Sequence, residues 1–278
     1  MAQQVALRLH AERRGRHTFA AHPHSHLEVW EEQGYNAVHG LRMRRTGDLN
    51  ELFTAADLAA IGEPLAAVVW ELPQRDLGGL LPPWEELREQ VALVRERGAA
   101  AHLDGARLFE AQTYYRRPFA EIAGLFDTVY VSLYKSLQGV RGAVLAADAA
   151  TVDAARVWRQ RLGGGIRDAW PLALAALAHL DGLPDRMAAY REHALALAAA
   201  INGGSAARAC PDPPQTPCST SICRPRNGPS SRPARPCSPS TASSCGGGCA
   251  PTPTPDGAAS RSASARTPWT SPPGRWPT

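Results

Sequence analysis

Short apolar runs alternate along the chain with stretches in which apolar residues recur every three or four positions. The runs are typical of buried strands, and LAAVVWEL at 65–72 is the clearest of them. They predict strands at 18–21, 65–72, 99–103, 128–133 and 142–147. The helical spacing predicts helices at 1–14, 25–33, 84–97, 106–114, 148–162, 169–180 and 186–201. This alternation indicates an α/β fold, with a mixed, mostly parallel sheet over 16–165 and helices on both faces.

The pattern ends near Ile201, where the composition changes abruptly. The last 76 residues, 203–278, hold 16 of the 24 prolines and all six cysteines, and they show no periodicity. Low hydrophobicity with many prolines predicts disorder. We therefore expect a large domain over 1–180, the start of a small C-terminal domain over 181–202, and a disordered tail over 203–278.

The charge of the chain is divided unevenly. The formal net charge is +4, and the tail alone contributes eight arginines against two aspartates. Residues 1–202 are therefore slightly acidic, and we expect no nucleic-acid partner. No apolar run is long enough to span a membrane, and 1–15 lack the continuous apolar core of a secretory signal. We expect a cytoplasmic protein with no membrane partner.

The tail and the early histidines lack the patterns of metal and nucleic-acid sites. The six tail cysteines form no CxxC pair, and the tail has no histidine. Its arginines are interleaved with only two aromatic residues, Trp269 and Trp276. His22, His24 and His26 alternate as metal ligands can, but without a clear set of partner ligands. We predict no metal site.

Lys135 is the only lysine in a chain with 29 arginines. Arginine can neither lose its proton nor form an imine with an aldehyde, whereas lysine can do both. Lys135 follows a predicted strand, as do Glu71 and Asp104. Ligands of parallel α/β sheets bind beyond the carboxyl ends of the strands. We expect the three residues to meet at one edge of the sheet; a chance surface lysine is the alternative.

A lysine amine and a carboxylate that face one cleft suit pyridoxal 5'-phosphate. The amine binds the aldehyde, and the carboxylate keeps the pyridine nitrogen protonated so that the ring withdraws electrons from the breaking bond. Ser132 lies three residues before Lys135 and is expected to donate to the phosphate, and Arg107 is expected to face the same pocket. A simple turn at Asp104 and a solvated helix face at Arg107 are the structural alternatives.

Three segments resemble one known family. HLDGARL at 102–108 looks like the segment that contains the ring-nitrogen aspartate of low-specificity threonine aldolases and related β-eliminating lyases. SLYKSL at 132–137 looks like the family's SLSKGL, and RQRLGGGIR at 159–167 looks like its segment running into LGGGMRQ. The resemblance covers roughly 1–201. It implies the aspartate-aminotransferase-like large domain of fold-type-I pyridoxal-phosphate enzymes, with pyridoxal 5'-phosphate as cofactor.

The resemblance also implies roles for single residues. HPHSHLEVWEE resembles the family's HIxxYE motif, which places His26 over the cofactor ring with Glu31 nearby. Lys135 then binds the cofactor covalently and Asp104 pairs with its ring nitrogen. The expected catalytic residues are Lys135, His26 and Asp104; Ser132 and Arg167 join them in cofactor binding; Arg107 and Gln74 bind substrate.

The chain departs from the family's pattern in several places, among them Gln160, which replaces the lysine of the family's arginine-lysine pair. ELPQRD at 71–76 stands where the family has ENTHN, so Gln74 replaces a histidine that can move protons near neutral pH. Residues 1–3 align with the middle of the family's SGTMAN phosphate loop. After Asn202 the tail replaces a small domain that contains a second carboxylate-binding arginine, which suggests a shift of reading frame in a GC-rich gene.

The sequence thus predicts a pyridoxal-phosphate-dependent lyase of an amino-acid substrate, acting by threonine-aldolase-like C–C cleavage or by β-elimination. Two alternatives stay open: a non-catalytic form of the fold, and another fold-type-I enzyme such as an aminotransferase or a C–S lyase. Exposed apolar helix surface around Leu172, Leu174 and Leu177 further predicts a homo-oligomer.

Overall fold

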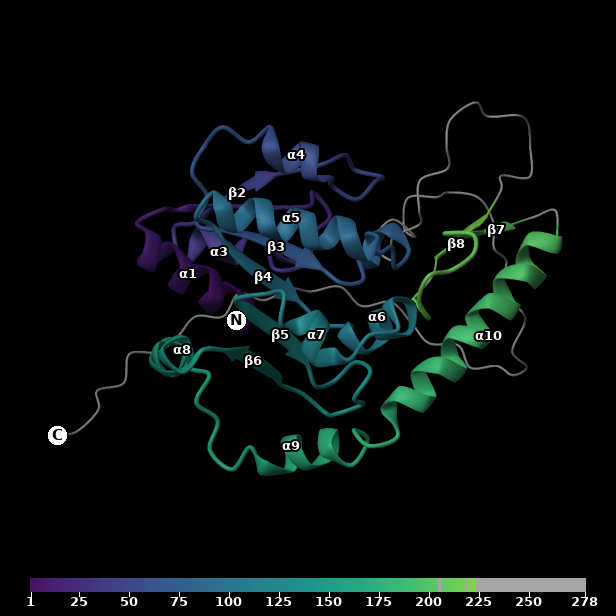
Figure 1. Ribbon diagram of the computed structural model, residues 1–278. Coiled ribbons are helices and arrows are strands. Elements are labelled where there is room, and N and C mark those ends of the chain that lie inside the picture. Colours follow the sequence, from purple (N-terminus) through teal and green to yellow (C-terminus); the bar gives the residue numbers. More distant parts are fainter. Residues whose placement is uncertain (205–206, 219, 224–278) are drawn as a thin grey trace, which may run out of the picture. The chain divides into compact units, whose positions relative to one another are not determined.

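A computed structural model describes residues 1–204, 207–218 and 220–223 (Figure 1). Its main sheet has six strands in the order β2-β1-β3-β4-β5-β6. These are β1 (Thr18–Ala21), β2 (Arg42–Arg45), β3 (Ala67–Glu71), β4 (Ala100–Asp104), β5 (Thr128–Ser132) and β6 (Ala143–Ala147). All neighbours pair in parallel except β6, which runs antiparallel to β5. The predicted mostly parallel α/β sheet is confirmed.

Helices join the parallel strands and cover both faces of the sheet (Figure 1). They are α1 (Ala2–Arg14), α2 (His26–Val29), α3 (Gly34–Ala37), α4 (Ala55–Ala59), α5 (Trp84–Glu96), α6 (Leu108–Tyr115), α7 (Phe119–Ala123), α8 (Ala149–Arg161), α9 (Trp170–Leu177) and α10 (Leu183–Gly203), with one 3-10 turn, η1 (Arg75–Leu77).

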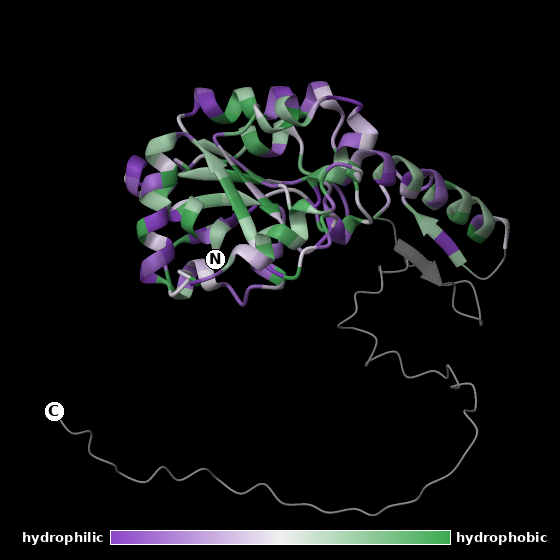
Figure 2. Cartoon of the chain, turned by 90° about the horizontal axis from the view of Figure 1, so that it is seen from below, coloured by the Kyte–Doolittle hydropathy of each residue, from purple (hydrophilic) through white to green (hydrophobic). Residues whose placement is uncertain are grey.

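Alternate residues of the central strands point to two separate cores. Val68 and Trp70 of β3 pack in a cluster with Leu87 of α5. Val69, between them in the sequence, packs in a second cluster with Leu7 of α1. Figure 2 shows these strands largely green and hydrophobic, between helices in which green and purple alternate. Side chains at 67, 69 and 71 of β3 therefore face α1, and those at 68 and 70 face α5.

Helix α1 forms as the apolar spacing predicts. Val5, Leu7 and Leu9 are buried, and Leu7 packs with Ala11 in the cluster that includes the strand residues Phe19, Ala67 and Val69. Gly15 ends the helix in the left-handed conformation, with φ of 60°, as a C-terminal glycine commonly does. Burial of three large aliphatic side chains contributes about 1.5–3 kcal/mol each, which stabilises the packed position of α1 independently of its polar residues.

Several elements differ from the sequence prediction. The helix expected at 25–33 is shorter: α2 ends at Val29, Glu32 and Gln33 adopt positive φ, and α3 begins at Gly34, where the sequence predicted a stop. Strand β2 and helices α4 and α7 were not predicted. Strand β2 has the sequence RMRR at the sheet edge and is mostly exposed, so it lacks the apolar alternation that identifies a strand.

Part of the segment expected to be disordered is ordered in the structure. After α10, β7 (Ala207–Cys210) and β8 (Thr220–Cys223) form a two-stranded antiparallel hairpin. The expectation of disorder therefore differs from the structure at 207–218 and 220–223. This part of the chain has no local periodicity, but it makes hydrogen bonds with Gly79 and Leu81, which are distant in the sequence. For 224–278 the expectation lies outside the described residues. No helix in the described part of the chain is long and apolar enough to cross a membrane.

Candidate active site

The site lies at the carboxyl edge of the sheet, on the face that α1 covers. Glu71 ends β3, Asp104 ends β4 and Ser132 ends β5. Strand pairing places Glu71 directly opposite Asp104. Lys135 follows in the turn after β5, where the backbone N–H of Gln138 donates to its carbonyl at 2.9 Å. The three strand ends thus bring together the polar residues that the sequence singled out.

Asp104 is buried, with only 3% of its surface exposed, and both its oxygens accept hydrogen bonds. Oδ1 accepts from the backbone N–H of Ala106 at 3.0 Å, and Oδ2 accepts from the Gln3 amide at 2.8 Å. Burial raises the pKa of Asp104; the two hydrogen bonds and the positive charges of Lys135 and His26 oppose that rise. The neighbours of Asp104 therefore stabilise its carboxylate form against the desolvation that burial imposes.

Glu71 joins the strand edge to two neighbouring segments. Its Oε2 accepts from the backbone N–H of His26 and from the Gln74 amide, each at 3.3 Å, and its Oε1 accepts from the backbone N–H of Arg75 at 3.2 Å. Burial, followed by the charge of Asp104, raises the pKa of Glu71 to about 8. Glu71 thus fixes the start of α2 and the Gln74 turn while carrying a proton near neutral pH.

Ser132 and Lys135 lie at the end of β5 and in the turn that follows it. Ser132 is 1% exposed, and its Oγ has no hydrogen-bond partner among the described residues. Lys135 is half-buried, and its Nζ lies 6.0 Å from the ring centroid of Tyr134. A buried hydroxyl without an acceptor suits an anionic oxygen such as that of a phosphate. These two residues fit the cofactor that the sequence predicts.

Arg107 precedes α6 and forms an ion pair with Glu110, with 3.1 Å between Nη1 and Oε1. Its Nε is buried without a partner among the described residues, as is Oε2 of Glu110. Ser136 Oγ also donates to Glu110, at 3.4 Å. The guanidinium therefore keeps an unused donor, as a carboxylate-binding arginine requires.

The remaining predicted residues differ in their placement. His26 begins α2, and its Nε2 lies 3.7 Å from Glu31 Oε1. Gln74 is 2% exposed and donates to the carbonyl of His24 at 3.1 Å as well as to Glu71. Arg167 is exposed in the turn after α8 and takes part in none of the hydrogen bonds described above. Among the described residues, no group of His, Cys, Asp and Glu is placed to hold a metal.

Sequence reasoning missed a polar column on α1. Gln3 donates to Asp104, and about two turns further along the same face His10 Nε2 lies 2.8 Å from Thr128 Oγ1. Thr128 Oγ1 also lies 2.7 Å from Nδ1 of His102, and burial lowers the pKa of His10 to about 4 and of His102 to about 3. Two buried polar residues spaced by seven on an apolar helix face were the available signal.

The segment 211–218 packs on the turn that follows Gln74. Leu81 N–H donates to Gln215 Oε1 at 2.7 Å, and Thr216 Oγ1 donates to the carbonyl of Gly79 at 3.2 Å. Gly79 has φ of 79°, and a Cβ there would overlap the carbonyl oxygen of Cys218. Close backbone approach at this glycine is therefore what allows the segment to border the site.

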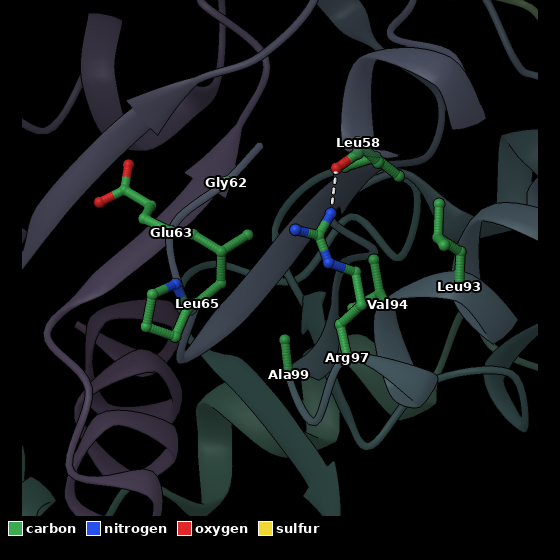
Figure 3. A pocket seen from close by; sticks show the side chains of 9 residues that line it. Leu58, Gly62, Glu63, Leu65, Leu93, Val94, Arg97 and Ala99 are labelled. Carbon is green, nitrogen blue, oxygen red and sulfur yellow. Dashed lines mark hydrogen bonds between the residues drawn. The ribbon is translucent and has the colours of Figure 1, made fainter. Parts of the chain in front are cut away.

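A separate hollow lies at the opposite, amino edge of the sheet. Arg97 occupies it and donates to the carbonyl of Leu58 at 2.6 Å, the contact dashed in Figure 3. The carbonyls of Ala59 and Ile61 also accept from this guanidinium. Its donors thus cap the end of α4. The strand-end carboxylates do not line this hollow. It is lined by Leu58, Gly62, Glu63, Pro64, Leu65, Leu93, Val94, Arg97 and Ala99.

The α/β fold with its mostly parallel sheet is that of the fold-type-I class of pyridoxal-phosphate enzymes, to which the similar solved structures belong. The comparison with known proteins gives the family. The Beta-eliminating lyase family matches residues 1–218, so the chain belongs to that family. The match extends past Asn202, where the resemblance was expected to end, and includes the ordered 211–218 segment.

Two solved structures are closely similar to the chain. A candidate aromatic amino acid beta-eliminating lyase/threonine aldolase of Exiguobacterium sp. 255-15 superposes with a TM-score of 0.78 at 39% identity, over 80% of this chain and 62% of that one. A candidate L-allo-threonine aldolase of Listeria monocytogenes EGD-E gives a TM-score of 0.78 at 38% identity, with the same shares covered.

Curated relatives point the same way. Low-specificity L-threonine aldolase 1 of Arabidopsis thaliana is 27% identical over 66% of this chain and 54% of its own length. The aldolase vrtJ of Penicillium aethiopicum is 31% identical over 63% of this chain and 47% of its own length. The chain spans about half the length of these relatives.

Proposed function

We propose that this protein is a pyridoxal-phosphate-dependent lyase of an amino acid. The observation that supports it best is the placement of Lys135 and Asp104 at one strand edge, close enough for the lysine charge to act on the buried carboxylate. The names of the relatives, several of them threonine aldolases, favour C–C cleavage of a β-hydroxy amino acid.

In this proposal, Lys135 would bind the cofactor through its amine, Asp104 would accept a hydrogen bond from the protonated ring nitrogen, and His26 would pack on the ring. Ser132 donates its unpartnered hydroxyl to the phosphate, with Arg167 as the further phosphate ligand. Bound pyridoxal phosphate supplies the electron sink for bond cleavage at the amino acid. Arg107 binds the substrate carboxylate with the N–H that Glu110 leaves free.

One residue favours β-elimination as the second candidate reaction. Retro-aldol cleavage needs a group that removes the proton of the substrate hydroxyl, and the buried Gln74 amide cannot accept a proton at neutral pH. β-Elimination breaks the bond from Cβ to a leaving group and needs no such base. In this proposal Gln74 orients the substrate. Which of the two reactions takes place then depends on the leaving group that the substrate has on Cβ.

The proposal is tested by product analysis of the full chain with added pyridoxal phosphate. L-threonine, L-allo-threonine and L-cysteine are supplied in turn. C–C cleavage of the first two yields glycine and acetaldehyde, whereas β-elimination from cysteine yields pyruvate, ammonia and sulfide. Either product set supports the lyase; transfer of the amino group to an added keto acid, with neither set formed, would assign the aminotransferase alternative.

We further infer that the protein is a cytoplasmic homo-oligomer. The support is apolar surface on α9, where Leu174 is 56% and Leu177 60% exposed. Such a patch on a soluble domain marks an association site. Light scattering on the full chain at micromolar concentration should give a mass of at least two copies, and a stable monomer would contradict the inference.

A further inference from the structure

Gln3 stands where α1 meets the carboxylate of Asp104. The residue is 2% exposed, and its Nε2 donates to Asp104 Oδ2 at 2.8 Å across 101 residues of sequence. Its Oε1 is buried with no hydrogen-bond partner among the described residues. A buried amide with one end unsatisfied costs free energy, so the bond to Asp104 is the contact that accounts for a polar residue here.

Gln3 donates to the carboxylate oxygen of Asp104 that receives no backbone hydrogen bond. Ala106 N–H already fixes Oδ1 at 3.0 Å, and Gln3 fixes Oδ2, so the plane of the carboxylate is set from both sides. An amide N–H binds an ionised carboxylate more strongly than a protonated one. Gln3 therefore stabilises the charged form that a ring-nitrogen partner needs.

The charged groups around Asp104 favour its ionised form. The positive charges of Lys135 and His26 stabilise the carboxylate. Burial raises the pKa of Glu71, opposite on β3, and of the Tyr130 hydroxyl, and the negative charge of Asp104 raises both further, so both groups stay protonated and uncharged beside it. Gln3 is the neutral side chain in this set that donates to Asp104, so its removal changes one hydrogen bond and no charge.

We propose that Gln3 is a positioning residue that orients Asp104 and holds it in the carboxylate form for the cofactor ring. The inference deepens the proposed function, because the ring nitrogen is the partner that this carboxylate would meet. It is separable from that function, since the effect of Gln3 on Asp104 exists in the protein before any cofactor is added.

The test is Gln3→Leu in the full chain, with the carboxyl signal of Asp104 followed by NMR of carbon-13-labelled aspartate as pH is varied. Asp104→Asn assigns the signal. Gln90→Leu is the matched control: Gln90 is also fully buried, accepts from Trp70 Nε1 at 2.8 Å and lies in the core of the opposite face. Gln3→Met, an unbranched alternative, serves if the leucine variant does not fold.

We expect Asp104 to protonate at higher pH in the Gln3 variants than in wild type, and Gln90→Leu to leave it unchanged. Affinity for pyridoxal phosphate should fall about tenfold in the Gln3 variants, as loss of one charge-assisted bond implies. An unchanged Asp104 titration would overturn the role of Gln3. If the Gln3 variants show the titration shift but wild type binds no pyridoxal phosphate, the proposed function is overturned and the role of Gln3 stands.

Discussion

Glu71 and Asp104 are paired residue for residue where β3 and β4 end, with Asp104 buried and Glu71 half-buried. Two like charges this close cannot both ionise cheaply in a site shielded from water. The pair is asymmetric, because Asp104 lies under the positive influence of Lys135 and His26. The geometry therefore assigns the negative charge to Asp104 and the proton to Glu71.

Glu71→Gln is expected to change how stability depends on pH. In the folded state the pKa of Glu71 is raised to about 8, whereas an unfolded glutamate titrates near 4.3. The folded protein therefore holds one more proton than the unfolded chain between these values, and wild-type stability falls as pH rises through this window. One proton corresponds to about 1.4 kcal/mol per pH unit.

The variant should show a shallower decline between pH 5 and pH 8 in urea unfolding, although it loses one acceptor and is less stable at pH 5. Glu63→Gln, at an exposed position, makes the same charge change and should leave the slope as in wild type. A Glu71→Gln slope equal to that of wild type would show that Glu71 is ionised throughout.

Gln74→His is expected to shift the reaction toward C–C cleavage. The buried amide contacts Glu71 and the carbonyl of His24, and an imidazole there can accept the substrate's hydroxyl proton near neutral pH. General-base catalysis contributes about 10²–10⁴-fold, so acetaldehyde release from L-threonine should rise by at least about tenfold. The measurement is the ratio of acetaldehyde to pyruvate across the substrate panel, and an unchanged ratio would remove Gln74 from the substrate site.

Gly79→Ala should detach the 211–218 segment. A methyl group there overlaps the carbonyl oxygen of Cys218 and lies 2.5 Å from Thr216 Oγ1, with φ of 79° that alanine adopts poorly. Overpacking of this kind costs about 1–3 kcal/mol. Gly62→Ala is the control, because nothing lies within 4 Å of its Cβ and its φ is ordinary. Urea unfolding compares the two, and equal stabilities would contradict the packing described here.

The sequence allowed the strand ends and their chemistry to be predicted, because both rest on local pattern. Apolar runs located β3, β4 and β5, and a single lysine among 29 arginines drew attention to Lys135. The conserved geometry of parallel sheets then placed Asp104 and Lys135 at one edge without any tertiary information.

Contacts between distant segments could not be predicted in the same way. Gln3 is one of two adjacent glutamines in α1, and only the fold shows that it meets a carboxylate 101 residues away. The 211–218 segment has no periodicity, and its order depends on two glycines after η1 that allow its backbone to approach. Strand β2 was missed because an exposed edge strand has no apolar alternation to detect.

Covalent binding of pyridoxal phosphate by Lys135 is the central claim, and Lys135→Arg tests it most directly. Arginine keeps the positive charge near Asp104 but does not condense with an aldehyde. With added cofactor, the wild-type chain should develop a visible absorbance band, and borohydride reduction should fix the added mass on the peptide that contains Lys135. The variant should show neither. A variant that keeps the band, or a wild type labelled elsewhere, would contradict the account.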